Sequence, residues 1–120
     1  MRDAAYEVLA QADPLSEIRF VHDYLQLVFW PHTLSLYPKL EVHAGGRRLT
    51  SSDNGYFDSI CRLIGQKLVA VTREEKMRLS FRFASGTSLL VSLRPGDAVG
   101  PEVAMLADDK GGLMVERYDD

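Results

Sequence analysis

The sequence contains a single cysteine, so no disulfide can form within the chain. A domain without disulfides fits a reducing compartment, and we therefore expect a cytoplasmic protein. No apolar run approaches the roughly 18 residues needed to span a bilayer. Residues 1–6 also lack the apolar core of a signal peptide. These absences predict a protein without a membrane partner.

Positive charge is scarce as well. The chain has 14 Lys and Arg against 17 Asp and Glu, which gives a net charge of −3. The densest basic pair, Arg47-Arg48, follows two glycines in a predicted turn. A nucleic-acid interface needs clustered Lys and Arg. We therefore expect no nucleic-acid partner, whereas a basic protein partner would suit the acidic balance.

Motifs that carry chemistry are missing too. The Gly45-Gly46 turn lacks the GxxxxGK[ST] spacing of a phosphate loop, and the segment 85–87 lacks the GxSxG pattern of a nucleophile elbow. The three histidines, His22, His32 and His43, have no Cys or Glu partner at metal-ligand spacing. The sequence thus predicts no catalytic residue, no metal and no cofactor.

What the sequence does contain is one apolar pattern that occurs twice. The first copy runs Leu25-x-Leu27-x-Phe29, Leu34-x-Leu36 and Pro38, and the second runs Leu79-x-Phe81-x-Phe83, Leu89-x-Val91-x-Leu93 and Pro95. Alternation at every second residue predicts two β-hairpins, each with one apolar face. They are either an internal repeat or two unrelated hairpins that obey the same period.

The register of each hairpin can be predicted from its faces. Opposed residues in an antiparallel pair have a constant index sum, and residues of one face must meet. Phe29 opposite Leu34 satisfies this rule in the first hairpin and implies a loop of even length. Phe83 opposite Leu89 satisfies it in the second and centres an odd loop on Gly86, where a positive φ costs little.

Two helices are expected. Residues 51–53 offer N-cap oxygens for a central helix, which Gly65 ends. Its wide apolar stripe comprises Tyr56, Phe57, Ile60, Cys61, Leu63 and Ile64. A cysteine on such a stripe is typical of a buried structural thiol. A short, loosely packed helix is predicted over residues 3–12, with Ala5, Val8, Leu9 and Ala12 on one face.

These elements predict a single α+β domain over residues 1–120. We expect a mainly antiparallel β-sheet of two or three hairpins packed against one central amphipathic helix, with a short N-terminal helix. The tail is open between two structures. Residues 103–107 and 113–117 form a third hairpin, which the Gly- and Asp-rich turn favours, or Pro101 opens a helix.

Two candidate sites remain. Val28, Trp30 and Leu90 face away from the predicted core, so an apolar patch there would mark a partner surface. Burial by the N-terminal helix or the tail is the alternative, and homodimerisation through Val28 and Trp30 or through an open hairpin edge is a further one. The second site is a cleft beside the sheet. Its lining would comprise His22, Tyr24, and Asp58 or Glu102.

The element order also carries a resemblance. A hairpin, a strand, a capped helix ending in Leu63-Ile64-Gly65, a strand, a hairpin with Phe81-x-Phe83-x-x-Gly86, and then Pro101-Glu102 follow one another. Over residues 17–102 this order resembles small bacterial α+β proteins of unknown function, some of which resemble immunity proteins of toxin systems. The resemblance implies a bacterial, cytoplasmic, non-catalytic protein and carries no catalytic residues.

The leading functional hypothesis is therefore a non-catalytic protein-binding module, immunity-like in that it acts by surface complementarity. Its partner would be another protein or a second copy of itself. The alternative is a small-ligand-binding or enzymatic α+β domain that uses the cleft beside the sheet.

Overall fold

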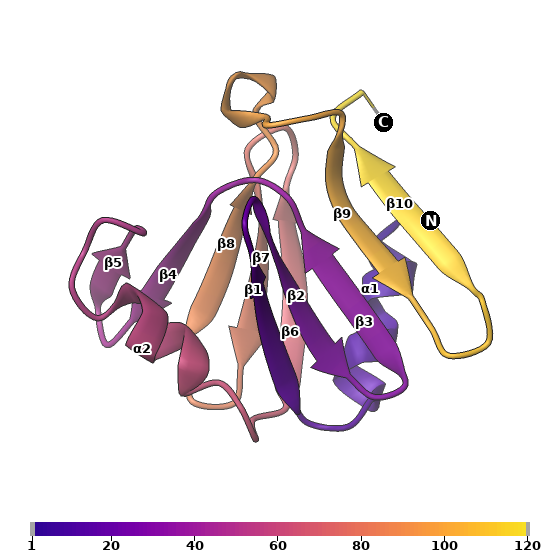
Figure 1. The fold of residues 1–120 in the computed structure, drawn as a ribbon, viewed down its shortest axis with the longest axis horizontal. Helices are drawn as coiled ribbons and strands as arrows, with labels where there is room; N and C mark the ends of the chain where they lie inside the picture. Colours follow the sequence, from indigo (N-terminus) through magenta and orange to yellow (C-terminus); the bar gives the residue numbers. More distant parts are fainter. Residues whose placement is uncertain (1, 120) are drawn as a thin grey trace.

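The chain folds into two five-stranded antiparallel sheets that pack face to face (Figure 1). The computed structural model describes residues 2–119. The first sheet contains β1 (Glu17–Val21), β2 (Tyr24–Phe29), β3 (His32–Leu36), β9 (Glu102–Ala107) and β10 (Leu113–Arg117), in that spatial order. The second contains, in spatial order, β5 (Arg47–Leu49), β4 (Leu40–Ala44), β8 (Ser88–Ser92), β7 (Arg78–Phe83) and β6 (Leu68–Glu74). The helices are α1 (Arg2–Gln11), α2 (Tyr56–Cys61) and the 3-10 turn η1 (Pro95–Asp97).

The second sheet, and not a central helix, covers the apolar face of the first. This corrects the expected arrangement of one sheet under one helix, although the α+β class and the antiparallel pairing are as predicted. Phe29 of β2 and Phe83 of β7 stack across the core, with ring centroids 5.9 Å apart. The apolar face of each hairpin is too large for the six residues of α2 to cover. A second sheet is broad enough to bury it.

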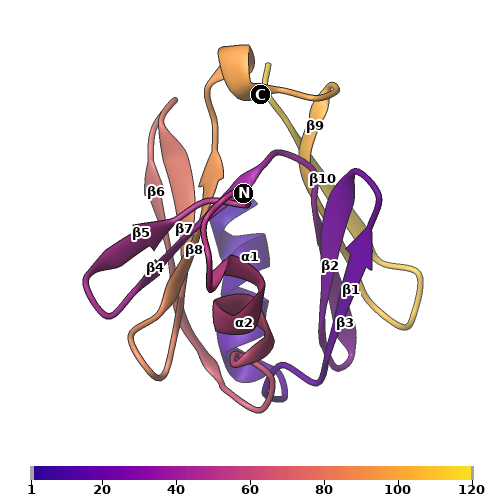
Figure 2. The same cartoon turned by 60° about the vertical axis from the view of Figure 1, so that its left-hand side comes forward.

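The two helices close the two open sides between the sheets. α1 packs against β6 and β10, which are edge strands of different sheets. α2 packs against β4, and its Phe57 meets Phe20 of the edge strand β1. Figure 2 shows the sheets on either side and the helices between them. α1 is well anchored rather than loose, because Tyr6 and Leu9 are fully buried.

The central helix is shorter than predicted, and its apolar stripe is divided. It begins after Gly55, and Asp53 caps the preceding turn instead by accepting a hydrogen bond from the Thr50 amide at 2.8 Å. Tyr56, Ile60 and Leu63 are buried, whereas Phe57, Cys61 and Ile64 are exposed. The expectation of a buried thiol at Cys61 is wrong, because a short helix at the sheet edges buries only one narrow stripe.

The chain divides into two halves with the same order of elements. Each half has a helix, three consecutive strands that pair as a meander, and a hairpin: α1, β1–β3 and β4–β5 in the first half, and α2, β6–β8 and β9–β10 in the second. The halves exchange their hairpins, since β9 pairs with β3 and β4 pairs with β8. Each sheet therefore contains strands of both halves.

Buried residues of the two halves correspond in sequence. Five pairs lie 54 positions apart: Tyr6 and Ile60, Leu9 and Leu63, Leu25 and Leu79, Leu27 and Phe81, and Phe29 and Phe83. The repeated pattern seen in the hairpins thus extends to the helix that precedes each meander.

The register of the first hairpin is two residues away from the expected one. Leu27 lies opposite Leu34, where we expected Phe29. The turn is tighter than predicted, because Trp30 and Pro31, joined by a cis peptide bond, form the whole loop. A shift by two residues keeps every side chain on its face, so the predicted inward residues are still the buried ones.

The second hairpin deviates in the same way. Phe81 lies opposite Leu89, where we expected Phe83. The amide of Phe83 donates to the carbonyl of Thr87 at 2.9 Å, so the loop has three residues. Gly86 takes the predicted positive φ, 93°, at the last of them. The odd loop length is confirmed, and its centre is not.

The tail forms the third hairpin, β9–β10, and not a helix after Pro101. Asp108 organises its turn by accepting hydrogen bonds from the amides of Lys110 and Gly112, at 2.9 and 2.7 Å. Within the part of the chain that the structure describes, neither helix has the length or apolar character to cross a bilayer.

Candidate functional site: an apolar patch, an aromatic pocket and a basic groove

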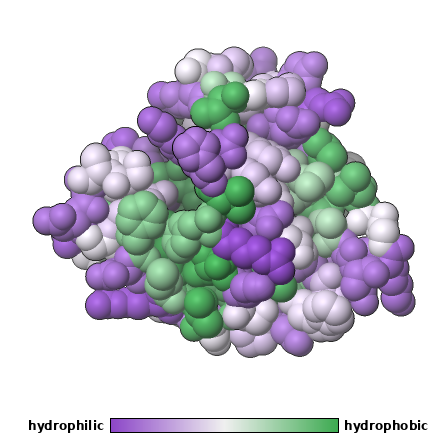
Figure 3. Space-filling model, viewed as in Figure 1, coloured by the Kyte–Doolittle hydropathy of each residue, from purple (hydrophilic) through white to green (hydrophobic). Residues whose placement is uncertain are grey.

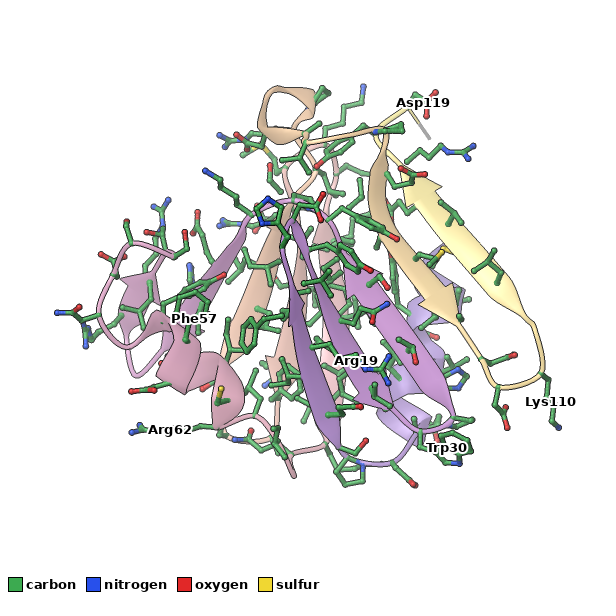
Figure 4. The ribbon with its side chains drawn as sticks, in the orientation of Figure 1. Arg19, Trp30, Phe57, Arg62, Lys110 and Asp119 are labelled. Carbon is green, nitrogen blue, oxygen red and sulfur yellow. The ribbon has the colours of Figure 1, made fainter. Side chains whose placement is uncertain are left out.

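An exposed apolar patch lies where α2 meets β1. It comprises Phe20, Phe57, Cys61 and Ile64, and we call it the apolar patch. Phe20, Phe57 and Ile64 are 48%, 52% and 50% exposed. The rings of Phe20 and Phe57 meet edge to face, with centroids 5.4 Å apart. Figure 3 shows apolar side chains gathered over α2 and β1, left of centre, and Figure 4 shows Phe57 there.

Among residues 2–119, the corresponding positions of the other half form no such patch. The positions 54 residues before Phe57, Cys61 and Ile64 are Asp3, Glu7 and Ala10, on the equivalent helix α1. Asp3 and Glu7 are exposed, as polar residues at a helix surface are expected to be. The fold can therefore form with a polar helix face at this position.

In the other half of the chain, an ion pair takes the place of the Phe20–Phe57 ring pair. Phe20 lies opposite Leu25, and Arg73 lies opposite Leu79, so Phe20 and Arg73 hold corresponding positions on β1 and β6. Nε of Arg73 donates to Oδ1 of Asp3 at 2.8 Å. Thus the strand-to-helix contact is ionic beside α1 and aromatic beside α2.

The ion pair beside α1 continues into a buried network. Both terminal nitrogens of Arg73 donate to the carboxylate of Glu116, at 2.8 and 2.9 Å, and the hydroxyl of Tyr6 donates to it at 2.7 Å. Glu116 is 2% exposed. Hydrogen bonding to Glu116 raises the pKa of Arg73 above its ordinary value. This network joins α1, β6 and β10 and closes that side of the sandwich.

An aromatic pocket of about 330 Å³ adjoins the apolar patch. It lies between the β1–β2 turn, the β3–β4 connection and α2. Its lining residues are Phe20, His22, Asp23, Tyr24, Leu25, Tyr37, Pro38, Lys39, Leu40, Tyr56 and Val99. Phe20 belongs to both features, and Phe57 contacts Tyr56 edge to face at 4.9 Å between centroids. The pocket and the patch therefore form one continuous apolar surface.

Two tyrosines of the pocket are neutral hydrogen-bonding groups. Burial raises the pKa of Tyr56 and, as the main cause, that of Tyr37. The Glu102 carboxylate also raises the pKa of Tyr37, against a hydrogen bond with Ser35 that lowers it. The Tyr24 and Tyr37 rings lie 5.3 Å apart between centroids. The pocket thus combines apolar walls with un-ionised phenol groups.

A larger groove of about 630 Å³ lies beside the pocket. It runs over the outer side of β4, β8 and β7 toward η1, and Lys39, Leu40 and Val99 line both spaces. Its lining includes four cations, Lys39, Arg48, Arg78 and Arg94, and two carboxylates, Glu41 and Asp97. We call it the basic groove.

The structure brings together half of the predicted cleft. His22 and Tyr24 both line the aromatic pocket, at and after the β1–β2 turn. Asp58 is exposed on α2 and lines neither space. Glu102 begins β9 and acts on Tyr37 without lining the pocket. Neither of the two candidate carboxylates therefore joins His22 and Tyr24 in the lining of the pocket.

The residues of the predicted partner surface lie on two different sheets. Val28 is half-buried on β2, and Trp30 is 59% exposed in the turn that follows. Leu90, on β8 of the other sheet, is buried at the basic groove. Figure 4 places Trp30 at the opposite end of the molecule from Phe57. The three residues do not form one surface.

The remaining histidines lie apart from one another. His32 begins β3, and His43 lies on β4, where its Nε2 is 3.5 Å from a carboxylate oxygen of Glu41. No group of three or more His, Cys, Asp or Glu side chains arranged to hold a metal ion occurs among residues 2–119.

Reasoning from the sequence missed Phe20 and Phe57 as surface residues. Phe57 was placed on the apolar helix stripe, and Phe20 was not among the candidate site residues. A signal was present in the width of that stripe, because Tyr56, Phe57, Ile60, Cys61, Leu63 and Ile64 cover more of a helix than one neighbour buries. Comparisons with protein-family models, curated proteins and solved structures found nothing that matches this chain.

Proposed function

We propose that this protein is a non-catalytic protein-binding module. An apolar segment of its partner covers the apolar patch and inserts a side chain into the aromatic pocket. Binding surfaces of this kind concentrate their energy in a few aromatic anchors around a pocket, with polar residues at the rim.

One observation carries this proposal. The contact between α1 and β6 is made by Asp3 and Arg73, and the corresponding contact between α2 and β1 is made by Phe57 and Phe20. Both arrangements complete the same fold, so folding does not require two half-exposed rings. Exposed apolar groups cost solubility and mark interaction surfaces when they are contiguous. The ring pair is best explained by a partner that covers it.

Peptide selection tests the proposal directly. A library of random displayed peptides is selected on the wild-type protein, with counter-selection on the double variant Phe20→Arg/Phe57→Asp. This variant transplants the ion pair of the other half and so removes the patch with a contact that the fold already uses. We expect enriched peptides with aromatic or aliphatic anchors that bind the wild type at least about tenfold more tightly, which equals about 1.4 kcal/mol.

A matched control separates the patch from other exposed aromatics. Trp30 is more exposed than Phe57 and lies at the other end of the molecule. The variant Trp30→Arg is expected to bind the selected peptides as the wild type does. Peptides that lose affinity with Trp30→Arg, or that bind the double variant equally well, would contradict the assignment. A dimeric mass in sedimentation that becomes monomeric in the double variant would make a second copy of the chain the partner.

An immunity-like role is one form of this function. The resemblance in element order and the net charge of −3 support a basic toxin as the partner. Co-expression with a candidate toxin would then restore growth with the wild type and not with Phe20→Arg/Phe57→Asp.

The second candidate is small-ligand binding in the aromatic pocket. Its volume of about 330 Å³ reaches the lower end of the range for ligand sites, about 300–1,000 Å³. Small aromatic fragments would then shift NMR signals of Tyr24 and Tyr37 at the pocket, and the variant Tyr37→Ala would abolish these shifts. Peptide binding without fragment binding would favour the protein partner.

A further inference from the structure

The basic groove has an unusual charge for this protein. The whole chain carries −3, yet the groove lining carries four cations against two carboxylates. The cations come from separate segments: Lys39 from the β3–β4 connection, Arg48 from β5, Arg78 from β7 and Arg94 from the connection between β8 and η1. Folding therefore concentrates positive charge that is scattered along the sequence.

Two of the four cations are neutralised by neighbours. Arg48 makes a two-point contact with Glu41, at 2.7 and 2.9 Å. Arg78 pairs with Glu74 at 3.3 Å. The second carboxylate of the groove, Asp97, accepts a hydrogen bond from the Ser92 hydroxyl at 2.5 Å.

Lys39 and Arg94 are the remaining two. Neither side chain has a carboxylate within 4.0 Å among the residues that the structure describes, and the Arg94 guanidinium lies 3.7 Å from the sulfur of Met77. Two unpaired cations in one groove attract an anion, because charge-assisted hydrogen bonds to ionised groups are stronger than neutral ones.

The floor and one wall of the groove are apolar. Leu90 is 7% exposed at the base, and Met77 and Val99 are exposed beside it. Ser51 adds a hydroxyl to the lining. A ligand that fits this lining has an anionic end and an apolar part.

We propose that the basic groove binds an organic anion, a phosphate monoester or a carboxylate joined to an apolar group. The anionic end binds Lys39 and Arg94, and the apolar part lies on Leu90, Met77 and Val99. The groove adjoins the aromatic pocket at Lys39, Leu40 and Val99, but no residue of the apolar patch lines it, so the proposal does not require the proposed partner.

NMR titration of the isotope-labelled full chain tests the site with three probes: phenyl phosphate, phenylacetate and inorganic phosphate. We expect both aromatic anions to shift the amide signals of residues 90–92, 94 and 96–99, more weakly at high salt. Inorganic phosphate is expected to bind less tightly, because it lacks the apolar part. Tighter binding of phenyl phosphate identifies a phosphate site, and tighter binding of phenylacetate identifies a carboxylate site.

Variants decide whether the named cations act. Arg94→Gln and Lys39→Gln are expected to weaken binding about tenfold each, since each removes a hydrogen bond to a charged group. Both side chains lack ion pairs, so the fold should be kept. Lys110→Gln, at the tip of the β9–β10 loop (Figure 4), is the control and should leave anion binding unchanged.

Shifts spread over all surface cations, or equal binding of inorganic phosphate, would overturn the proposal. Phe20→Arg/Phe57→Asp should bind the anions normally, which separates this site from the patch.

Discussion

The ring of Phe57 on α2 meets the ring of Phe20 on β1 edge to face, with centroids 5.4 Å apart. The corresponding residues of the other half, Asp3 and Arg73, form an ion pair at 2.8 Å. One backbone geometry thus accommodates an aromatic contact on one side and an ionic contact on the other. Asp3 and both rings are about half exposed, whereas the Arg73 side chain is largely buried and also pairs with Glu116.

The first prediction concerns this exchange of contacts. Phe20→Arg/Phe57→Asp is expected to change the free energy of unfolding by less than about 1.5 kcal/mol. The lost edge-to-face contact is worth about 0.5–1.5 kcal/mol, and a surface ion pair returns about 0–1 kcal/mol. Urea denaturation measures the difference. A loss above about 3 kcal/mol would show that the rings belong to the core rather than to a surface.

The buried ion pair makes a second prediction. Arg73→Met removes the two hydrogen bonds that the guanidinium donates to the buried Glu116 carboxylate, and we expect it to cost about 3–5 kcal/mol of unfolding free energy. Arg73→Met/Glu116→Leu removes both charges and should recover most of that loss, because an apolar pair of similar volume is often neutral. Both are compared by urea denaturation at neutral pH. A double variant as unstable as the single one would contradict this account.

Acid titration of the β9–β10 turn is the third prediction. Hydrogen bonds from the amides of Gly112 and Lys110 lower the pKa of Asp108. A carboxylate with a depressed folded-state pKa stabilises the fold above its unfolded pKa of about 3.9, and this contribution is lost as the pH falls through the folded value. Carbon NMR should therefore show Asp108 titrating below about 3.9. Asp108→Asn should flatten the fall in stability over that window.

Asp109→Asn is the matched control for Asp108. It changes the same turn by the same charge, and Asp109 is not the acceptor for the turn amides. Its unfolding free energy should fall with acid as in the wild type. Equal behaviour of the two variants would mean that net charge, and not the turn hydrogen bonds, sets the pH dependence.

The fourth prediction uses the exposed thiol of Cys61. Because the chain has one cysteine and it is exposed, a chromogenic disulfide reagent should label one thiol per chain under native conditions. A selected peptide bound at the apolar patch should slow this labelling, and Trp30→Arg should leave the protection intact. Labelling that occurs only after denaturant is added would place Cys61 in the core.

The inward faces of the two hairpins could be predicted because alternation is a local property. Leu27, Leu34, Phe81 and Leu89 are buried as expected, although both registers are shifted by two residues. A shift of two preserves the faces, so the apolar pattern cannot distinguish neighbouring registers. The observed registers follow from loops that are each two residues shorter than expected.

The candidate site was less predictable. His22 and Tyr24 were expected at a cleft and line the aromatic pocket. Phe57 was placed on the helix stripe expected to cover the sheet, because apolar periodicity shows which residues share a face and not what covers that face. Lys39 and Arg94 are 55 positions apart in the chain, and no sequence pattern indicates that they line one groove.

By itself the sequence determined the strands and the inward residues of the two repeated hairpins, because these follow from side-chain alternation, but it did not determine the exact turns. Only the tertiary structure decided that the hairpins face one another in two sheets and that the helices close the open sides. It also decided that Phe20 and Phe57 remain exposed where Arg73 and Asp3 form their ion pair in the other half. The reason is that burial depends on the neighbour that covers a face, and that neighbour comes from a distant part of the chain.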